Sequence, residues 1–421
     1  MAVESNMPSN FRVIPGQLRS PYFARLVLFA ALALTLGACG GDGDDTDDNP
    51  FGLTSQTVAA AQNPVALTFA PDGRLFFAEK YTGAIRVVDS SGKLLDEPFV
   101  DIDVANWLNL DWGLTGLALD PDFADNGYVY AFYTEIFSPS DTAPVAKPVL
   151  IRYKDQANRG VEPTVLIDDL PPTRLNYQGY KGTGAIHFGP DGELYMTLGD
   201  YDWNKDGPNG IGAAQDLTIP MGKVLRVNDS GEAVAGNPFA ADPGADSRIF
   251  AYGFNQGSAF AFNPQSGGLY TTDGTGSCEE LDIVVAGGDY GWPDVGEFPF
   301  SDCYFGEQVD PIFLFAKEPS KPGDFLSGPG ISGLSFVSGL EYSTLGDGLL
   351  VCESQTGLMR RLVLSPPNYN QVTANDVVVE DCQADVAVAP DGTIYYSNKV
   401  EIKRLNPPVA TQTAAPFGPL N

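Results

Sequence analysis

The sequence predicts an all-β fold in which residues 53–409 form one six-bladed β-propeller of four-stranded blades. An apolar strand, a Pro-Asp-Gly type turn and an aromatic-rich strand recur along the chain. The composition combines 47 Gly, 33 Pro and 11% aromatic residues with few long stretches of helical period. Such repeats are typical of units that bury their apolar faces only by stacking on their neighbours. A tandem of two smaller β domains is the alternative.

Six segments carry the repeat, and each places turn residues between apolar and aromatic ones. They are FAPDGRLFFAE (69–79), LDPDFADNGYVYAFY (119–133), FGPDGELYMTLGD (188–200), FNPQSGGLYTTD (262–273), LGDGLLVCES (345–354) and VAPDGTIYYSN (388–398). Their uneven spacing indicates long inserted loops. Propellers carry function on loops at one face, so we expect the site there.

Residues 1–38 are predicted to be a lipoprotein signal peptide. Arg19 and Arg25 precede LVLFAALALTLGAC, an apolar run that is too short to span a bilayer and ends in small residues. Its ending resembles a bacterial lipobox, which implies cleavage before Cys39 and a lipid on that thiol. Because residue 40 is Gly rather than Asp, we expect an outer-membrane anchor facing the periplasm or the cell surface. An ordinary secretory signal is the alternative.

Charge and flanking segments limit the partners. Residues 39–52 include GGDGDDTDDNP, which has nothing apolar to bury and predicts a lipidated, acidic, flexible tether; residues 410–421 form a C-terminal tail. The net charge of −30 argues against nucleic acid or anionic lipid headgroups as partners. We expect a monomer that meets the membrane only through its lipid anchor.

Four cysteines remain after the lipidated one, and an even count in an exported chain favours two disulfides. Closeness in sequence suggests the pairs Cys278–Cys303 and Cys352–Cys382, although four cysteines allow three pairings. A metal-thiolate site is less favoured, because the chain has no Cys-x-x-Cys pair.

Four ordered blocks resemble the glucose/sorbosone dehydrogenase family. They are QNPVALTFAPDGRLFFAEKYTGAIRVVD, GLTGLALDPDFADNGYVYAFYT, AAQDLTIPMGKVLRVN and EELDIVVAGGDYGWPDVGE. The resemblance covers nearly the whole mature chain. It implies a six-bladed propeller with calcium and pyrroloquinoline quinone at its centre. It also implies that the protein oxidises an aldose at C1.

The resemblance also points to catalytic positions. The family has a general base, a histidine, eight residues before the glycine of the FGPDG turn, and here that position is Lys181. Lysine could act as a base only if desolvation lowered its pKa strongly. The family's sugar-contacting polar residue corresponds to Asp111. The single histidine, His187, lies in an expected strand next to Phe188, and we expect it to pack within a blade.

The quinone-binding positions differ from the family's pattern. The quinone has three carboxylates, for which arginine is the best-suited partner. The family's Tyr-Gly-x-Arg-Asn corresponds to residues 252–256, so Asn255 and Gln256 stand at the cofactor positions. Its Arg-x-Arg-Asp corresponds to residues 382–385, with Cys382 and Ala384 in place of the arginines.

Two segments are candidate calcium sites. By resemblance, Glu280 provides a side-chain ligand and Tyr290 a backbone carbonyl. Separately, Asp202, Asn204 and Asp206 form a D-x-N-x-D-G loop, whose alternating oxygen donors and glycine let a chain curl around one ion. A polar surface turn is the alternative for this loop.

Aromatic residues near these positions suit stacking against a sugar. They are Trp107, Trp112, Tyr177, Tyr180, Tyr201 and Trp203. Blade-edge packing is the alternative for each ring.

Two functions follow from these observations. The family resemblance implies an oxidoreductase that uses pyrroloquinoline quinone to oxidise an aldose at C1. The altered site positions favour instead a non-catalytic, calcium-ordered propeller that binds a small or polymeric carbohydrate, or a protein, at the cell envelope.

Overall fold

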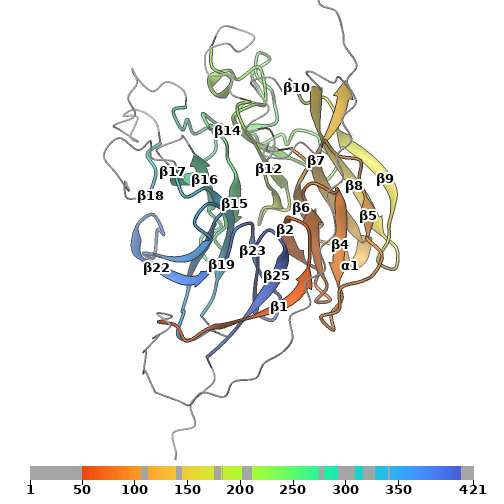
Figure 1. Ribbon diagram of the computed structural model, residues 1–421. Helices are drawn as coiled ribbons and strands as arrows, with labels where there is room; N and C mark the ends of the chain where they lie inside the picture. Colours follow the sequence, from red (N-terminus) through yellow and green to blue (C-terminus); the bar gives the residue numbers. More distant parts are fainter. Residues whose placement is uncertain are drawn as a thin grey trace, which may run out of the picture. The chain divides into compact units, whose positions relative to one another are not determined.

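A computed structural model describes residues 50–105, 112–138, 145–174, 182, 184–201, 211–274, 279–292, 309–315, 328–339 and 342–408. The chain divides into two compact units, Met1–Asp47 and Asp48–Asn421, and everything described below belongs to the second. Its strands form six antiparallel sheets in sequence order (Figure 1). In the described part of the chain, no helix is long and apolar enough to cross a membrane.

The first three sheets have four, five and four strands. Sheet 1 contains β2 (Pro64–Phe69), β3 (Leu75–Glu79), β4 (Ala84–Val88) and β5 (Val100–Asp101). Sheet 2 contains β6 (Leu114–Leu119), β7 (Tyr128–Ser138), β8 (Val145–Asp155), β9 (Gly160–Ile167) and β10 (Thr173–Arg174). Sheet 3 contains β11 (Ile186–Phe188), β12 (Leu194–Leu198), β13 (Lys223–Val227) and β14 (Ile249–Tyr252).

The last three sheets have four strands each. Sheet 4 contains β15 (Ala259–Phe262), β16 (Leu269–Gly274), β17 (Glu279–Val284) and β18 (Phe313–Phe315). Sheet 5 contains β19 (Ile331–Val337), β20 (Gly348–Glu353), β21 (Leu358–Leu364) and β22 (Val372–Glu380). Sheet 6 contains β23 (Val386–Val388), β24 (Ile394–Ser397), β25 (Glu401–Asn406) and β1 (Thr54–Ala60). The short helices α1 (Phe123–Asn126) and η1 (Ala213–Gln215) lie in connections.

Each repeat found in the sequence joins the first and second strands of one sheet. The glycines of the Pro-Asp-Gly turns adopt the left-handed backbone that a side chain disfavours, with φ of +86° at Gly73 and +80° at Gly192. The amide of Gly73 donates to the carbonyl of Ala70 at 2.9 Å, which closes the turn. The repeats therefore mark the inner hairpins, and the six-bladed propeller is confirmed.

The first strands of the six sheets follow one another in a closed ring. β2 contacts β6 and β23, β6 contacts β11, and β19 contacts β15 and β23. Between β11 and β15, the rings of His187 and Phe260 lie 4.9 Å apart, centroid to centroid.

Among the described residues, six buried apolar clusters lie between neighbouring sheets. Each strand contributes side chains to the clusters on both faces of its sheet, because successive side chains point to opposite faces. In β3, Phe76 and Ala78 pack toward sheet 2, whereas Leu75 and Phe77 pack toward sheet 6. Each sheet therefore needs two neighbours, and only a closed ring provides them.

Strand β1 closes the ring by joining the last sheet. It pairs antiparallel with β25, from Thr54 opposite Asn406 to Ala60 opposite Glu401, so orange-red β1 and blue β25 lie side by side in Figure 1. The predicted disulfide Cys352–Cys382 is present and links β20 to the segment before β23. Cys278 and Cys303 lie outside the described residues.

Candidate functional site: the central cavity

A cavity of about 510 Å³ lies among the first strands of the six sheets. Its wall includes Val65 of β2, Thr115 of β6, Ile186 of β11, Ala259 of β15, Ile331 of β19 and Asp385, which directly precedes β23. The volume falls within the range of about 300–1,000 Å³ that is typical of small-molecule sites. The ring of first strands thus positions one candidate site at the middle of the fold.

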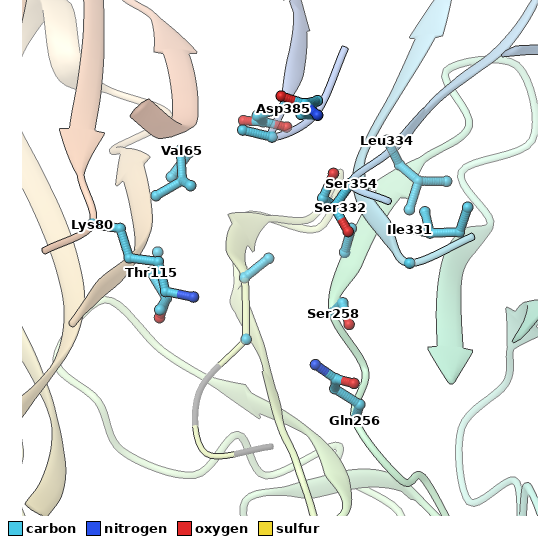
Figure 2. A pocket seen from close by; sticks show the side chains of 18 of the residues that line it. Val65, Lys80, Thr115, Gln256, Ser258, Ile331, Ser332, Leu334, Ser354 and Asp385 are labelled. Atoms are coloured by element: carbon cyan, nitrogen blue, oxygen red, sulfur yellow. The ribbon is translucent and has the colours of Figure 1, made fainter. Parts of the chain in front are cut away.

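Much of the polar wall is uncharged. Figure 2 shows hydroxyl and amide side chains around the cavity together with the apolar Val65, Ile331 and Leu334. The uncharged polar residues labelled there are Thr115, Gln256, Ser258, Ser332 and Ser354. Such a wall can exchange hydrogen bonds with hydroxyl groups and pack against C–H groups of one ligand.

Two carboxylates of the wall already bind backbone amides. Asp385 accepts hydrogen bonds from the N–H groups of Leu67 at 2.7 Å and Val386 at 2.8 Å. Burial raises the pKa of Asp385 to about 7. Glu279 accepts from the N–H groups of Gly330 and Ile331, and burial raises its pKa too. Both acids hold the wall together through these bonds.

His187 lies on β11, as expected, and its ring meets Phe260 edge to face. It also lines the cavity, which the sequence did not indicate. The side chain is half-buried, and desolvation lowers its pKa to about 4. The imidazole is therefore neutral at pH 7, with one nitrogen that can donate a hydrogen bond and one that can accept. It has no hydrogen-bond partner among the described residues.

The positions that the sequence resemblance matches to the family's arginines carry no cation. Asn255 is 1% exposed, and its side-chain amide donates to the carbonyl of Gly274 at 2.8 Å. Cys382 is buried in the disulfide, and Ala384 presents only a methyl group to the cavity. Gln256 lines the cavity as a neutral amide. In the described wall, the cations are Lys80 and Lys399.

The predicted calcium segment contains buried oxygens that suit a hard cation. Glu280 and Asp282 are 3% and 1% exposed, and each has one carboxylate oxygen without a hydrogen-bond partner in the described structure. Asp273 stands opposite Glu280 in the sheet. Burial and the nearby carboxylates raise the pKa of Glu280 to about 10. The hydroxyl of Tyr290 donates to the carbonyl of Ile283 at 2.7 Å, which ties its loop to β17.

These donors fit calcium, which prefers oxygen ligands. No three acidic, histidine or cysteine side chains in the described ranges are arranged to hold a metal by themselves. A calcium ion at Glu280 would therefore take backbone carbonyls and water as its other ligands.

Several predicted site residues lie outside the described part of the chain. They are Asp111 and Lys181, the loop residues Asp202, Asn204 and Asp206, and the aromatics Trp107, Tyr177, Tyr180 and Trp203. Two predicted sugar-stacking rings are instead fully buried, since Trp112 and Tyr201 have no exposed surface. For these two rings the packing alternative is correct, because each fills an apolar cluster.

The chain matches the family model described as Glucose / Sorbosone dehydrogenase over residues 61–405. Quinoprotein glucose dehydrogenase B of Acinetobacter calcoaceticus is 29% identical over 256 residues, which are 57% of this chain and 52% of that relative. The chain thus spans about half the length of that relative. The aldose sugar dehydrogenase of Escherichia coli K12 is 26% identical over 79% of this chain and 86% of its own length.

The fold also matches solved structures. An oxidoreductase described as a glucose dehydrogenase, from Thermus thermophilus, superposes with a TM-score of 0.67 and 28% identity over 84% of this chain and all of its own. The ordered repeats, the six sheets and the match over residues 61–405 agree. This chain belongs to the glucose/sorbosone dehydrogenase family.

Proposed function

We propose that this protein binds a carbohydrate in its central cavity. The observation that carries the proposal is the mixed wall in Figure 2, where neutral hydroxyl and amide groups line the same cavity as apolar side chains. A sugar presents hydroxyl groups at its edge and C–H groups on its faces, and such a wall satisfies both. Membership of a sugar dehydrogenase family supports the same ligand class.

The described wall does not fit pyrroloquinoline quinone. Three carboxylates need fixed cations, because a buried anion without a partner is strongly disfavoured. Asn255, Cys382 and Ala384 stand where the family has arginines, and the two lysines of the wall are accompanied by two acids.

Quinone-dependent oxidation of an aldose at C1 is the second candidate, and the family match over residues 61–405 favours it. Lys181 would then have to accept the proton that the family's histidine accepts, and Asp111 would contact the sugar. Lysine is protonated at neutral pH unless its pKa falls from about 10.4 to near 7.

Sugar binding and dye reduction together decide between the two functions. We expect a bound sugar to raise the melting temperature without quinone, by the equivalent of about 2.7 kcal/mol at a hundredfold excess over its Kd. We expect no aldose-dependent dye reduction with added quinone and calcium. Saturable dye reduction that disappears in Lys181→Ala would establish the second candidate instead.

Hydroxyl deletions locate the sugar. Thr115→Val and Ser332→Ala each remove one hydroxyl group from the wall and should weaken sugar binding about two- to tenfold. Thr164→Val, on an exposed position of β9, is the matched control and should bind normally. Equal affinities in all three variants would place the sugar elsewhere.

We also propose that calcium binds at Glu280 and stabilises the propeller. The melting temperature should rise with calcium and fall with a chelator, because an ion that binds only the folded state stabilises it. Glu280→Gln should reduce the response, whereas the exposed control Glu232→Gln should keep it. Asp202→Ala with Asp206→Ala tests the second candidate loop. An unchanged melt in every condition, with no metal found by elemental analysis, would refute both sites.

Finally, we propose that the protein is a monomer anchored in the bacterial envelope through a lipid on Cys39. Wild-type cells should incorporate labelled palmitate into the protein, and Cys39→Ala should not. Incorporation by the variant would contradict the anchor.

A further inference from the structure

Three consecutive residues, Gln383, Ala384 and Asp385, form one part of the cavity wall and are called the wall segment. They lie in the connection between β22 and β23, directly after Cys382 of the disulfide. We propose that the Cys352–Cys382 disulfide is a positioning element of the ligand site, which holds the wall segment in its binding position before a ligand is bound. The inference rests on the proposed carbohydrate function and explains how that site keeps its shape.

On one side, the wall segment is bound to Ser397 of β24 in sheet 6. The N–H groups of Gln383 and Ala384 both donate to the carbonyl of Ser397 at 3.1 Å. The N–H of Ser397 donates to the carbonyl of Asp385 at 2.9 Å, and the Ser397 hydroxyl accepts from the N–H of Asp385 at 3.1 Å. Because Ser397 has no exposed surface, these bonds are protected from water. They fix the segment to sheet 6.

On the other side, the disulfide attaches the wall segment to sheet 5. Both cysteines are fully buried, and the N–H of Cys382 donates to the carbonyl of Gly357, between β20 and β21, at 2.7 Å. Cys352 lies in β20, and this strand leads into Ser354 and Gln355, which line the same cavity. The bond therefore connects two parts of the cavity wall, one at the end of β20 and the other in the wall segment.

Asp385, at the upper edge of Figure 2, extends these contacts to sheet 1. Its carboxylate accepts from the N–H of Leu67 in β2 at 2.7 Å. Gly333 of β19 packs directly against it, since a Cβ atom at that glycine would lie 2.6 Å from Asp385 Oδ1. A carboxylate packed this closely depends on the exact position of its backbone. A displaced wall segment would therefore change the cavity wall and its contact with sheet 1 together.

The differences from the family pattern fit a positioning role for the disulfide. Cys382 and Ala384 stand where the sequence resemblance places two arginines. An arginine can be held by an anionic ligand, whereas a cystine or an alanine offers such a ligand no charged partner. The covalent bond instead restricts the segment in the free protein, so less conformational entropy is lost when a ligand binds. The wall is thus formed in advance and without the quinone.

Amide hydrogen exchange measures whether the disulfide holds the wall segment, and it needs no ligand. Cys352→Ala with Cys382→Ala removes the bond. Lys223→Met is the matched control, because it removes a buried hydrogen-bond donor from β13 of sheet 3 and should lose a similar amount of stability elsewhere. We expect the amides of the wall segment and of Leu67 to exchange at least tenfold faster in the cysteine variant than in the control. The amides of β7 should exchange equally in both.

Calorimetric titration with glucose, galactose and xylose measures the effect on the ligand site. The double cysteine variant should bind about tenfold more weakly than the wild type, because the released segment must be ordered on binding. Lys223→Met should bind as the wild type does. Either single variant, Cys352→Ala or Cys382→Ala, breaks the whole bond, so each should lose as much affinity as the double variant. Cys352→Val with Cys382→Ala conserves more buried volume and takes the place of the alanine pair if that variant does not fold.

Two results would overturn the inference. Equal exchange of the wall segment in the cysteine variant and in Lys223→Met would show that the bond does not hold the segment. Faster exchange with unchanged sugar affinity would show that the segment takes no part in ligand binding. If the wild type binds none of the three sugars while the exchange difference is present, the disulfide positions the wall as proposed and the carbohydrate function fails instead.

Discussion

Lys223 shows how burial sets the role of a single charged residue. It has no solvent exposure, and its ammonium group donates to the carbonyls of Ala213, Ala214 and Met221 at 2.7, 2.9 and 2.7 Å. Burial lowers its pKa to about 7 and Asp216 opposes that shift. Three acceptor-only carbonyls match the three N–H donors of the charged form. This lysine therefore holds the loop around η1 against β13.

Replacing Lys223 by Met should destabilise the propeller by about 3 kcal/mol or more, because buried carbonyls would lose their donor. The free energy of unfolding in urea measures this. Lys154→Met, at an exposed position of β8, is the control and should change stability by less than about 0.5 kcal/mol. Equal stability of the two variants would contradict the role assigned to Lys223.

His187 gives a pH prediction that is simple to measure, because it is the chain's single histidine. Protein labelled with ¹⁵N-histidine should show one imidazole that titrates near pH 4 rather than 6.5. Between those values the unfolded chain binds more protons, so the contribution of His187 to stability is full above pH 6.5 and is lost as pH falls toward 4. A bound sugar should also shift this signal.

The stability trend must be measured as the difference between wild type and His187→Leu. Asp385, whose pKa is raised to about 7, changes stability in the opposite direction over an overlapping range. If the imidazole titrates near pH 6.5 and its ¹⁵N signal does not change when sugar is added, the ring is exposed to solvent and lies away from the ligand.

At the scale of the elements, the inner hairpins are held by local contacts, whereas the disulfide connects residues that are far apart in the sequence. The hairpin turns are local, so their sequences alone specify them. The Cys352–Cys382 disulfide instead joins β20 of sheet 5 to the connection that leads from β22 to β23, the first strand of sheet 6. It connects residues with a sequence separation of 30.

Breaking this disulfide should lower stability by about 3–4 kcal/mol, because the unfolded chain regains the conformational entropy that the closed loop had removed. Non-reducing peptide mapping should recover Cys352 and Cys382 in one cross-linked fragment. Cys352→Ala with Cys382→Ala should melt at a lower temperature than wild type in oxidising buffer. Alkylation of both cysteines in the denatured, unreduced protein would show that the bond is absent.

At the scale of the whole molecule, ring closure depends on the two ends of the propeller. β1 supplies the outer strand of sheet 6, and the Asp385 carboxylate binds the amide of Leu67 in sheet 1. Without these contacts, sheets 1 and 6 would each expose an apolar face. Closure therefore contributes to the stability of every sheet and of the cavity that they surround.

A chain that begins at Gln62 lacks β1 and should unfold at a clearly lower temperature than wild type, with a broader transition. A chain that begins at Pro50 keeps every described strand and is the matched control; it should melt as the wild type does. Identical melting of the two truncated chains would show that β1 contributes nothing to closure. Circular dichroism during heating provides the measurement.

Of the three pairings open to the four cysteines, the sequence only suggested Cys352–Cys382, and the structure shows that bond. The sequence alone determined the repeating hairpins, the six blades and the family. These depend on local turn chemistry, on strand alternation and on ordered motifs, all of which lie within short segments. Only the tertiary structure decided what faces the cavity. It placed His187 at the cavity wall and buried Trp112 and Tyr201 in the core. It also linked Lys80 and Lys399 through backbone hydrogen bonds to Asn63. The physical reason is that the direction of a side chain and its distance from residues of other sheets depend on how the sheets pack. A short sequence pattern does not specify that packing.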